Sequence, residues 1–223
     1  MDRAAVYIYP NGTPATRNRQ VYSPTIAILR HAGFKQEFSR PKGARGKQRT
    51  TFLLTEQFQR LYDAAVEIDT DFAGFIVFLC YTGCRLSEAC NLKSDDVHLS
   101  EGWAYVRETK NGAARTVFLP PVVVAAMANL ARAPARSAFR FQKNGRLYTL
   151  LDRVAVRACV EIPARVAFHI FRHTYGAWMQ RAGADLVGTG AWKSQQAANV
   201  YKHIEITEEA KKAALLPMII SQA

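Results

Sequence analysis

Acidic residues are scarce in this chain. It carries 18 Asp and Glu against 30 Lys and Arg, which leaves a formal net charge of +12, and the sequence pI is near 9.8. A basic excess of this size favours a polyanionic partner, most often nucleic acid and less often an anionic membrane. A basic protein without such a partner is the alternative. The clustering of the cations along the chain favours nucleic acid.

Long hydrophobic runs are also missing. The longest apolar stretch, residues 72–84, contains two glycines and is too short to span a membrane. The N-terminus holds Asp2 and Arg3 and lacks the apolar segment of a signal peptide. The four cysteines form no CxxC pair, which disfavours zinc and favours reduced thiols in the cytosol. We therefore expect a cytoplasmic protein with no membrane partner.

Nucleotide-binding signatures are absent as well. The sequence has no GxxxxGK[ST] phosphate loop, no alternating β-α-β pattern, no internal repeat and no low-complexity tract. A hydrophobic share of 49% is enough for a substantial core. The remaining pattern predicts an α+β fold that is mainly α, in which helices surround one small antiparallel β-sheet.

The first fifty residues read as a small segment followed by a basic linker. Residues 5–9 (AVYIY) predict a short β-like piece, Ser23-Pro24 predicts the start of a helix, and Gly33 its end. The linker cations alternate with Gly and Pro, so the linker is either a solvated connector or a strip that lies along DNA phosphates. These cations are Arg40, Lys42, Arg45, Lys47 and Arg49.

Most later elements are helices with clear boundaries. Residues 71–82 predict a buried helix that breaks at Gly83, and the runs on either side of Asn111-Gly112 predict a β-hairpin. Further helices are expected after Thr55, from Pro121, within residues 143–162, over residues 168–182 and from Gln195.

Residues 168–180 (FHIFRHTYGAWMQ) carry a cluster of polar groups at the start of a helix. His169, Arg172 and His173 stand at i, i+3 and i+4, so they share one face in the first turn. The helix dipole favours an anion there, a guanidinium can grip two phosphate oxygens, and an imidazole can move a proton. Taken alone, the pattern favours a surface arginine with two structural histidines.

Arg85 stands just after the Gly83 break, at the rim of the core. A charge held there needs an anionic partner, and Glu88, one turn further on, can supply it. This is either a simple ion pair or a carboxylate that orients Arg85 toward a phosphate. Lys110 at the hairpin tip is chemically relevant only if the tip folds over DNA. Trp192 and Tyr201 are, by themselves, compatible with plain packing.

Together these segments resemble the tyrosine recombinases, the phage-integrase family. YTGCRLSEACNL (81–92) resembles the family's first-arginine box, and FHIFRHTYGAWMQRAG (168–183) resembles its His-x-x-Arg-His box. GAWKSQQAANVYKHI (190–204) resembles its closing box, in which a His or Trp stands nine positions before the tyrosine nucleophile. The match spans roughly residues 50–205 and is carried by the order and spacing of six positions. The resemblance implies the catalytic set Arg85, Lys110, His169, Arg172, Trp192 and Tyr201, with Glu88 and His173 in support.

The resemblance implies a DNA strand transferase that needs neither metal, ATP nor another cofactor. Tyr201 would attack a phosphodiester, form a 3′-phosphotyrosyl link and release a 5′-hydroxyl, and a second DNA end would then attack that link. Arg85 and Arg172 would stabilise charge on the non-bridging oxygens. His169 and His173 would move protons or position the phosphate, and Lys110 would protonate the leaving oxygen.

Two features depart from the family pattern. The closing box usually reads Leu-Gly-His, whereas here it reads Gly190-Ala191-Trp192, which moves the expected role of that position toward packing and positioning. At the front, residues 1–40 resemble only the last part of a helical DNA-gripping domain, so the chain looks truncated. The resemblance thus implies a partial core-binding remnant and basic linker at 1–49 and a catalytic domain at 50–223.

Other functions remain open at this stage. A type IB topoisomerase-like nicking and resealing enzyme would use the same residues. A catalytically limited or non-catalytic integrase fragment would only occupy DNA. A metal-free nuclease would use His169 and His173 but has no need of Tyr201.

The expected partners are double-stranded DNA and further copies of the chain. The apolar residues between 213 and 220 either close the protein's own core or dock onto a neighbouring protomer, which would give a dimer or tetramer on DNA. The resemblance implies a bacterial or phage origin and a nucleoid-associated place in the cytoplasm.

Overall fold

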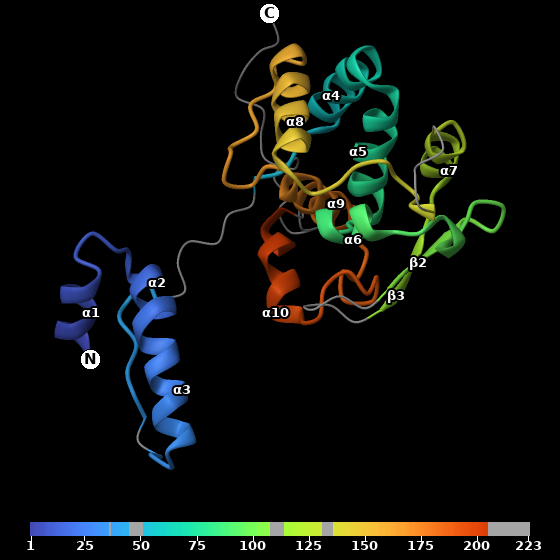
Figure 1. Cartoon of the computed structure of the whole chain (residues 1–223). Helices are drawn as coiled ribbons and strands as arrows, with labels where there is room; N and C mark the ends of the chain where they lie inside the picture. The colour runs from blue at the N-terminus through green and yellow to red at the C-terminus, as the bar shows by residue number, and fades with distance from the viewer. Residues whose placement is uncertain (36, 45–50, 108–113, 131–135, 205–223) are drawn as a thin grey trace, which may run out of the picture. The chain divides into compact units, whose positions relative to one another are not determined.

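The computed structural model describes residues 1–35, 37–44, 51–107, 114–130 and 136–204. The chain forms two compact units, Met1–Arg49 and Thr50–Ala223, which Figure 1 labels element by element. Across the described ranges, no helix is both long and apolar enough to cross a membrane.

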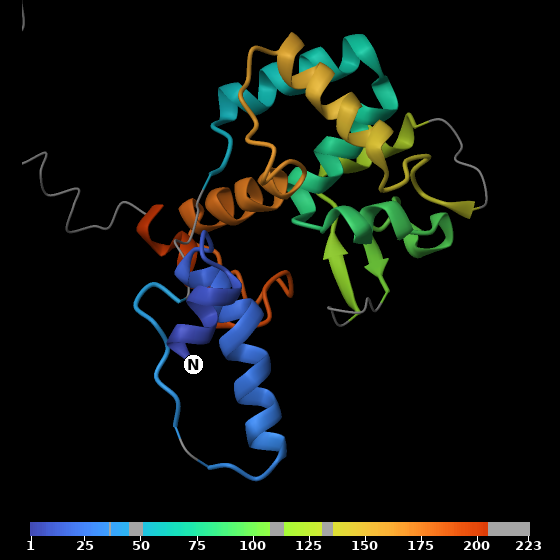
Figure 2. The same cartoon turned by 60° about the vertical axis from the view of Figure 1, so that its left-hand side comes forward.

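The first unit is a small helical body, coloured blue in Figure 2. Its minor core consists of Ala5, Val21, Tyr22 and Ile26. Its last helix ends at His31, and Gly33 follows with a left-handed φ of 86°, as the sequence predicts. The elements are α1 (Asp2–Ile8), α2 (Pro14–Arg17), the π-helical η1 (Asn18–Tyr22) and α3 (Ser23–His31).

The short strand predicted over residues 5–9 is wrong, because residues 2–8 form α1. A lone strand would leave its backbone N–H and C=O groups without a ladder partner, whereas a helix pairs them internally. Asp2 suits the positive end of the helix dipole, and its carboxylate accepts the hydroxyl of Tyr22. Burial of Ala5 decides which face of α1 turns inward.

Helix α3 begins at Ser23, as predicted, but Ser23 is not its N-cap, because the chain is already helical at Tyr22 and no side chain caps the start. The helical run begins at Pro14 and is capped by Thr13, whose hydroxyl oxygen accepts a first-turn N–H at 3.2 Å. Pro24 therefore lies inside the run. Because proline has no N–H for the carbonyl four residues earlier, the helix widens into π-helical η1 just before it. Thr13-Pro14 and Ser23-Pro24 carry the same start signal, and the sequence alone does not rank them.

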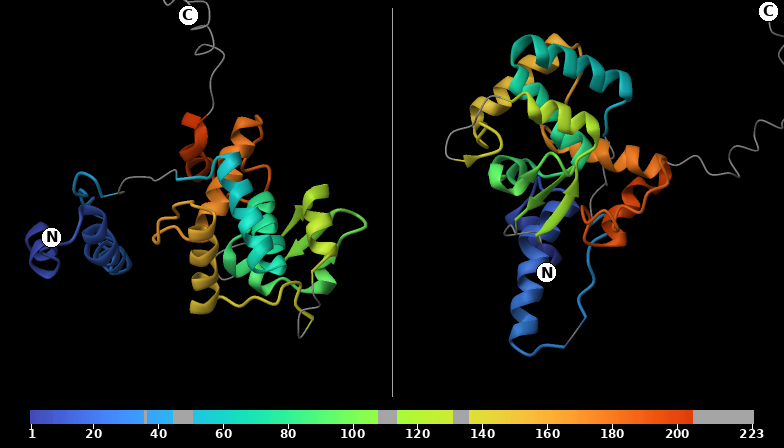
Figure 3. Two further views of the ribbon diagram at one scale, coloured as in Figure 1. Left: turned by 90° about the horizontal axis from the view of Figure 1, so that it is seen from above. Right: turned by 90° about the vertical axis from the view of Figure 1, so that its right-hand side faces the viewer.

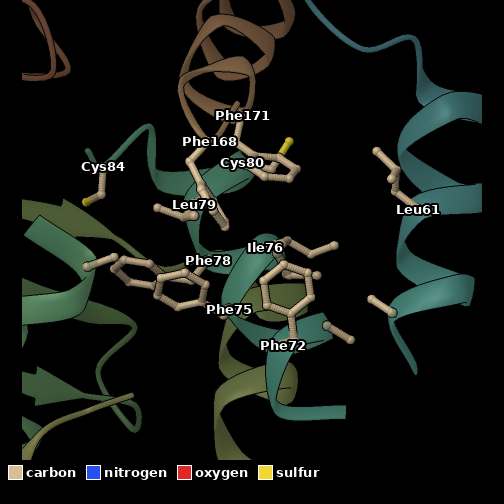
Figure 4. Close-up of a cluster of buried hydrophobic side chains, with 14 of the residues drawn as sticks. Leu61, Phe72, Phe75, Ile76, Phe78, Leu79, Cys80, Cys84, Phe168 and Phe171 are labelled. Carbon is tan, nitrogen blue, oxygen red and sulfur yellow. The ribbon is translucent and has the colours of Figure 1, made fainter. Parts of the chain in front are cut away.

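The second unit is built around α5 (Thr70–Thr82), a helix that is buried on almost every side. Figure 4 shows Phe72 and Phe75 of α5 in the same cluster as Phe168 and Phe171. The ring of Phe75 also lies 5.0 Å from that of Phe139, centroid to centroid. Aromatic side chains bury large areas, so this cluster supplies much of the hydrophobic stabilisation. The predicted buried helix is confirmed.

Besides the short α6 (Leu86–Asn91) that follows it, three helices pack against α5 (Figure 3). They are α4 (Thr55–Ile68), α7 (Pro121–Ala128) and α9 (His169–Arg181), while α8 (Gly145–Arg157) packs against α4. The starts predicted at Thr55 and Pro121 are confirmed. The chain ends its described part with α10 (Gln195–Ala198) and the 3₁₀ turn η4 (Asn199–Ile204), as predicted from Gln195 onward. Because η4 packs on α9, Tyr201 is brought to the His-x-x-Arg-His helix.

The described strands form one three-stranded antiparallel sheet in the order β1-β2-β3. Ala104 of β2 pairs with Val117 of β3, which confirms the two arms of the predicted hairpin. The tip of that hairpin, with Lys110 and Asn111-Gly112, lies outside the described residues. The elements are the 3₁₀ turn η2 (Ser94–Asp96), β1 (Val97–His98), β2 (Trp103–Val106) and β3 (Arg115–Phe118). The predicted mainly α fold with one small antiparallel sheet is confirmed.

Candidate active site

Arg85 follows a sharp reversal of the chain. Gly83 ends α5 in the left-handed conformation, with φ 62°, and a Cβ at this position would collide with the ring of Tyr175. Two residues later Arg85 is the N-cap of α6 (Leu86–Asn91). Its side chain is 35% exposed, so the guanidinium reaches the surface from a backbone that is fixed on both sides.

Glu88 holds Arg85 in place. One carboxylate oxygen accepts the backbone N–H of Arg85 at 2.9 Å, and the other accepts its Nη1 at 2.7 Å. The predicted Arg85–Glu88 ion pair is therefore present, with the Glu88 side chain only 1% exposed. Burial alone would raise the pKa of Glu88, but the hydrogen bond and charge of Arg115, together with the bonds from Arg85, lower it below its ordinary value.

A third cation, Arg115 of β3, has no counterpart among the residues predicted from the sequence. Its Nη2 donates to Glu88 at 2.9 Å and lies 3.5 Å from the Cys84 sulfur. Its Nε is buried and has no hydrogen-bond partner in the described part of the chain. Strand alternation could have indicated that Arg115 points toward the core, since Arg115 and the buried Val117 share a face of β3. An arginine on the core side of a strand needs a buried acid.

Arg172 is buried, at 4% exposure, rather than lying on an open face of α9. Its Nη1 and Nη2 donate to the backbone carbonyls of Gly83 and Ala191. A guanidinium carries five N–H donors, so the other three remain for a bound phosphate. Burial and then repulsion by Arg85 lower the pKa of Arg172 to about 10, which still leaves it protonated at neutral pH.

His169 and His173 lie next to each other at the start of α9, with ring centroids 4.6 Å apart. Desolvation, followed by the charges of Arg172 and Arg85, lowers the pKa of His169. Burial, followed by the proximity of His169 and Arg172, lowers the pKa of His173 to about 4. His173 is therefore a neutral imidazole at neutral pH and can accept a hydrogen bond on one ring nitrogen.

Trp192 packs among three residues of the site. Its ring is parallel to that of Tyr175 within 3°, the guanidinium carbon of Arg172 lies 4.6 Å from its centre, and the ring of Tyr201 meets it edge-on at 5.5 Å. Cation–π and edge-to-face contacts of this kind each stabilise an arrangement by about 1 kcal/mol. These contacts support the packing role that the resemblance implied for this position.

Tyr201 is 3% exposed and lies against α9. Its hydroxyl is 2.6 Å from Nδ1 of His173. The ring fits only because residue 176 is glycine, since a Cβ there would lie 2.9 Å from the Tyr201 Cζ. Burial raises the pKa of Tyr201 to about 12, against a smaller lowering by Arg172. The phenol is therefore neutral, and it donates to the imidazole when His173 carries its proton on Nε2.

A cavity of about 400 Å³ opens beside these residues. Arg85, His169 and Arg172 line it, together with Tyr148 of α8, whereas Tyr201 does not. At the start of α9 the first three backbone N–H groups already donate to carbonyls of residues 166–168. None of those three N–H groups is free for an anion, so the predicted anion contacts at this helix start fall to side chains alone. The described residues contain no group of three His, Cys, Asp or Glu that could hold a metal ion.

Two of the predicted linker cations, Arg40 and Lys42, belong to the described part of the first unit. Arg40 donates to Asn18 and, at 3.0 Å, to the Ser23 hydroxyl, so its guanidinium is held within the first unit. Lys42 is exposed in the same unit. The remaining predicted cations, Lys110, Arg45, Lys47 and Arg49, lie outside the described residues.

The model of the Phage integrase family matches residues 51–208. The chain belongs to the phage integrase family. The matched range contains all six positions of the predicted catalytic set. Members of the family are tyrosine recombinases, DNA strand transferases that carry out site-specific recombination.

Several individual tyrosine recombinases are similar to this chain in sequence or in structure. Tyrosine recombinase XerA from Pyrococcus furiosus is 24% identical over 212 residues, which cover 87% of this chain and 73% of that protein. A crystal structure of XerA recombinase aligns with 97% of this chain and 82% of its own, at 20% identity and a TM-score of 0.60. The Tn1549 transposon integrase, solved in complex with circular intermediate DNA, aligns with 96% of this chain and 83% of its own, at 18% identity and a TM-score of 0.71. The catalytic domain of bacteriophage HP1 integrase aligns with 75% of this chain and 96% of its own, at 20% identity and a TM-score of 0.58. These likenesses show that the recombinase fold is shared.

Proposed function

We propose that this recombinase cuts and rejoins double-stranded DNA through a covalent link between Tyr201 and a 3′-phosphate. The observation that carries the proposal is the position of the Tyr201 hydroxyl, 2.6 Å from His173 and beside Trp192 and Arg172. Side chains of α9, of the loop before α10 and of η4 meet there. DNA binding is supported by the formal charge of +12 and by the DNA complexes of the Tn1549 integrase.

Each step follows from the contacts of the site. The phenol oxygen of Tyr201 attacks the phosphorus, its proton passes to Nδ1 of His173, and the bond from phosphorus to the 5′ oxygen breaks. An approaching phosphate raises the proton affinity of His173, because its negative charge favours the imidazolium. Arg85 and Arg172 stabilise the charge on the non-bridging oxygens. Lys110 protonates the leaving 5′ oxygen. A second 5′-hydroxyl then attacks the link and frees Tyr201.

The two parts of the chain have different roles in this proposal. Residues 50–223 form the catalytic domain, and residues 1–49 are a core-binding segment with a basic linker that lies along DNA. Reduced thiols at all four cysteines support a place in the cytoplasm, with the nucleoid DNA as substrate. Copies of the chain associate on DNA through the apolar residues between 213 and 220. Sedimentation of the full chain with and without DNA tests that association, and a monomer in both cases would contradict it.

Trapping on randomised DNA tests the chemistry without knowledge of the target site. The wild-type protein is incubated with a library of nicked random-sequence duplexes, covalent complexes are isolated in detergent, and the modified peptide is mapped by mass. We expect the adduct on Tyr201. Tyr201→Phe should abolish adducts and leave DNA affinity nearly unchanged.

Tyr148 supplies the matched control. It lines the cavity beside Arg85, so it is the rival nucleophile on position alone. Tyr148→Phe should keep forming adducts. Adducts that survive in Tyr201→Phe and vanish in Tyr148→Phe would overturn the assignment. A supercoil-relaxation assay run beside a two-site recombination assay separates a topoisomerase-like enzyme from a recombinase.

A further inference from the structure

Two more cations stand at the rim of the cavity that contains Arg85 and Arg172. Lys143 lies just before α8, and Arg165 lies in the turn before α9; both line the cavity of about 400 Å³. Both side chains are exposed. Within the part of the chain that the structure describes, neither has an ion pair or a hydrogen bond.

The charge around the cavity is of one sign. Four cations line it, and none of the described lining residues is Asp or Glu. Like charges around one cavity repel each other, so the arrangement is stabilised when an anion enters. Glu88 holds Arg85 from behind, and two backbone carbonyls hold Arg172. Lys143 and Arg165 have no such support from the described residues, and their charge is available to an external partner.

The turn that carries Arg165 is held in an uncommon conformation. Ala167 has φ 34°, in the left-handed region that residues with a Cβ seldom adopt. The N–H groups of Val166 and Ala167 both donate to the carbonyl of Pro163, at 2.9 and 3.1 Å. Strained turns of this kind persist where surrounding structure holds them, and they cluster at ligand sites. Here the turn keeps Arg165 beside His169.

We propose that Lys143 and Arg165 bind a second phosphate of the same DNA strand, next to the phosphate held by Arg85 and Arg172. The proposal rests on the proposed function and adds a subsite to it. A cavity of about 400 Å³ is in the range that encloses whole small molecules, so it has room beyond one phosphate. Neighbouring phosphates are separated by only one nucleotide, with a rise of about 3.4 Å along the strand. Gripping two of them fixes which phosphate is presented for cleavage.

Small nucleotides test this subsite directly. Thymidine 5′-monophosphate and thymidine 3′,5′-bisphosphate are titrated into the full chain, and binding is followed by NMR. We expect the bisphosphate to bind the wild-type protein about tenfold more tightly, as charge-assisted hydrogen bonds to a second phosphate require. Lys143→Gln and Arg165→Gln should each remove most of that preference while the affinity for the monophosphate stays close to the wild-type value.

Arg153→Gln is the matched control. Arg153 is also an exposed cation of this region, on α8, but it lines a different cavity beside Ile68. This variant should keep the tenfold preference. Equal affinities of the wild-type protein for the two nucleotides would overturn the proposal. An equal loss in Arg153→Gln would also overturn it, because the effect would then be general electrostatic attraction.

The outcome separates the subsite from the chemistry. Neither nucleotide needs Tyr201 to bind, so the titration is repeated in Tyr201→Phe, where the same preference is expected. A bisphosphate preference without covalent adducts in the trapping experiment would contradict the proposed function and leave the subsite standing. Covalent adducts without the bisphosphate preference would contradict the subsite and leave the proposed function standing.

Discussion

The contact between Tyr201 and His173 joins two neutral groups. Burial raises the pKa of the phenol to about 12 and lowers that of the imidazole to about 4. Each shift disfavours the charged form, and the 2.6 Å contact is consistent with a neutral donor and a neutral acceptor. The nucleophile is therefore held as a phenol until a phosphate arrives, and its reactivity depends on the charge that the DNA brings.

The lowered pKa of His173 predicts a stability change at mildly acidic pH. The ordinary pKa is 6.5 and the folded value is about 4, so between these values the unfolded chain binds a proton that the folded chain does not. This contribution to the free energy of unfolding should be level above pH 6.5 and decrease as the pH falls toward 4. Urea unfolding at pH 7.5, 6 and 5 should show a smaller decrease in His173→Gln than in the wild type. Parallel pH profiles would refute the assignment.

The Glu88–Arg115 pair predicts a large loss of stability on truncation. Both side chains are nearly inaccessible, at 1% and 10% exposure. Breaking a buried pair typically costs about 3–5 kcal/mol, because the remaining charge stays buried. Some of this is offset here by Arg85, which still pairs with Glu88. Arg115→Met should therefore lose about 2–4 kcal/mol in urea unfolding.

An exposed pair serves as the control for that measurement. Arg136 and Asp95 are 3.8 Å apart, with side chains 84% and 66% exposed. Surface pairs contribute about 0–1 kcal/mol, so Arg136→Met should unfold close to the wild-type midpoint. Similar small losses in both variants would mean that Arg115 is not structurally important.

The sequence predicted the Arg85–Glu88 pair because one helical turn separates the two residues. It did not predict the burial of Arg172, because the acceptors are backbone carbonyls that lie 89 and 19 residues away. Every residue has a backbone carbonyl, so residue types do not show which carbonyls accept from Arg172. Arg115 was missed for a different reason: the acid that it pairs with, Glu88, lies 27 residues away in the sequence.

At the scale of elements, η4 and α9 fit together through one small residue. Gly176 lies in the middle of α9, and a Cβ there would lie 2.9 Å from Tyr201 and 3.1 Å from Trp192. An alanine would add about 1 kcal/mol of helix propensity to α9 while displacing the element that packs on it. The two contributions oppose each other, so the free energy of unfolding alone would not show that η4 is displaced.

Chemical accessibility shows the displacement instead. In Gly176→Ala we expect Tyr201 to be nitrated by tetranitromethane several-fold faster than in the wild type, where it is 3% exposed. Tyr7, at 88% exposure, is the internal reference and should react equally in both proteins. Gly145→Ala is the matched substitution, because nothing lies within 4 Å of its added Cβ. Unchanged nitration in Gly176→Ala would show that Tyr201 does not need this space.

Elements with strong local signals were predictable and weakly marked ones were not. The buried helix α5, the hairpin arms and the proline-led helix α7 have clear composition and boundary residues. The segment that became α1 has the β-branched and aromatic residues of a strand, yet the described residues of its unit supply no strand for it to pair with. Pairing is decided by the whole unit, so local propensity failed there.

At the scale of the whole molecule, the formal charge of +12 predicts salt-sensitive DNA binding. Cations that neutralise phosphates release condensed counterions, so the logarithm of affinity falls linearly with the logarithm of salt concentration. If about six phosphates are contacted, affinity for a random-sequence duplex should drop about 10³-fold between 50 and 200 mM salt. Fluorescence anisotropy measures it. An affinity that stays flat over this range would contradict a phosphate-dominated interface.

The two backbone carbonyls that hold Arg172 affect which substitutions this protein can accept. Its two anchoring oxygens belong to the main chain, so substitutions leave the chemical identity of either acceptor unchanged. The anchor at position 83 is nevertheless restricted in residue type, because the left-handed turn and the nearby Tyr175 ring favour glycine there. Substitutions of Gly83 are therefore expected to be poorly tolerated, because they disturb the bend before Arg85 and the anchor of Arg172 together.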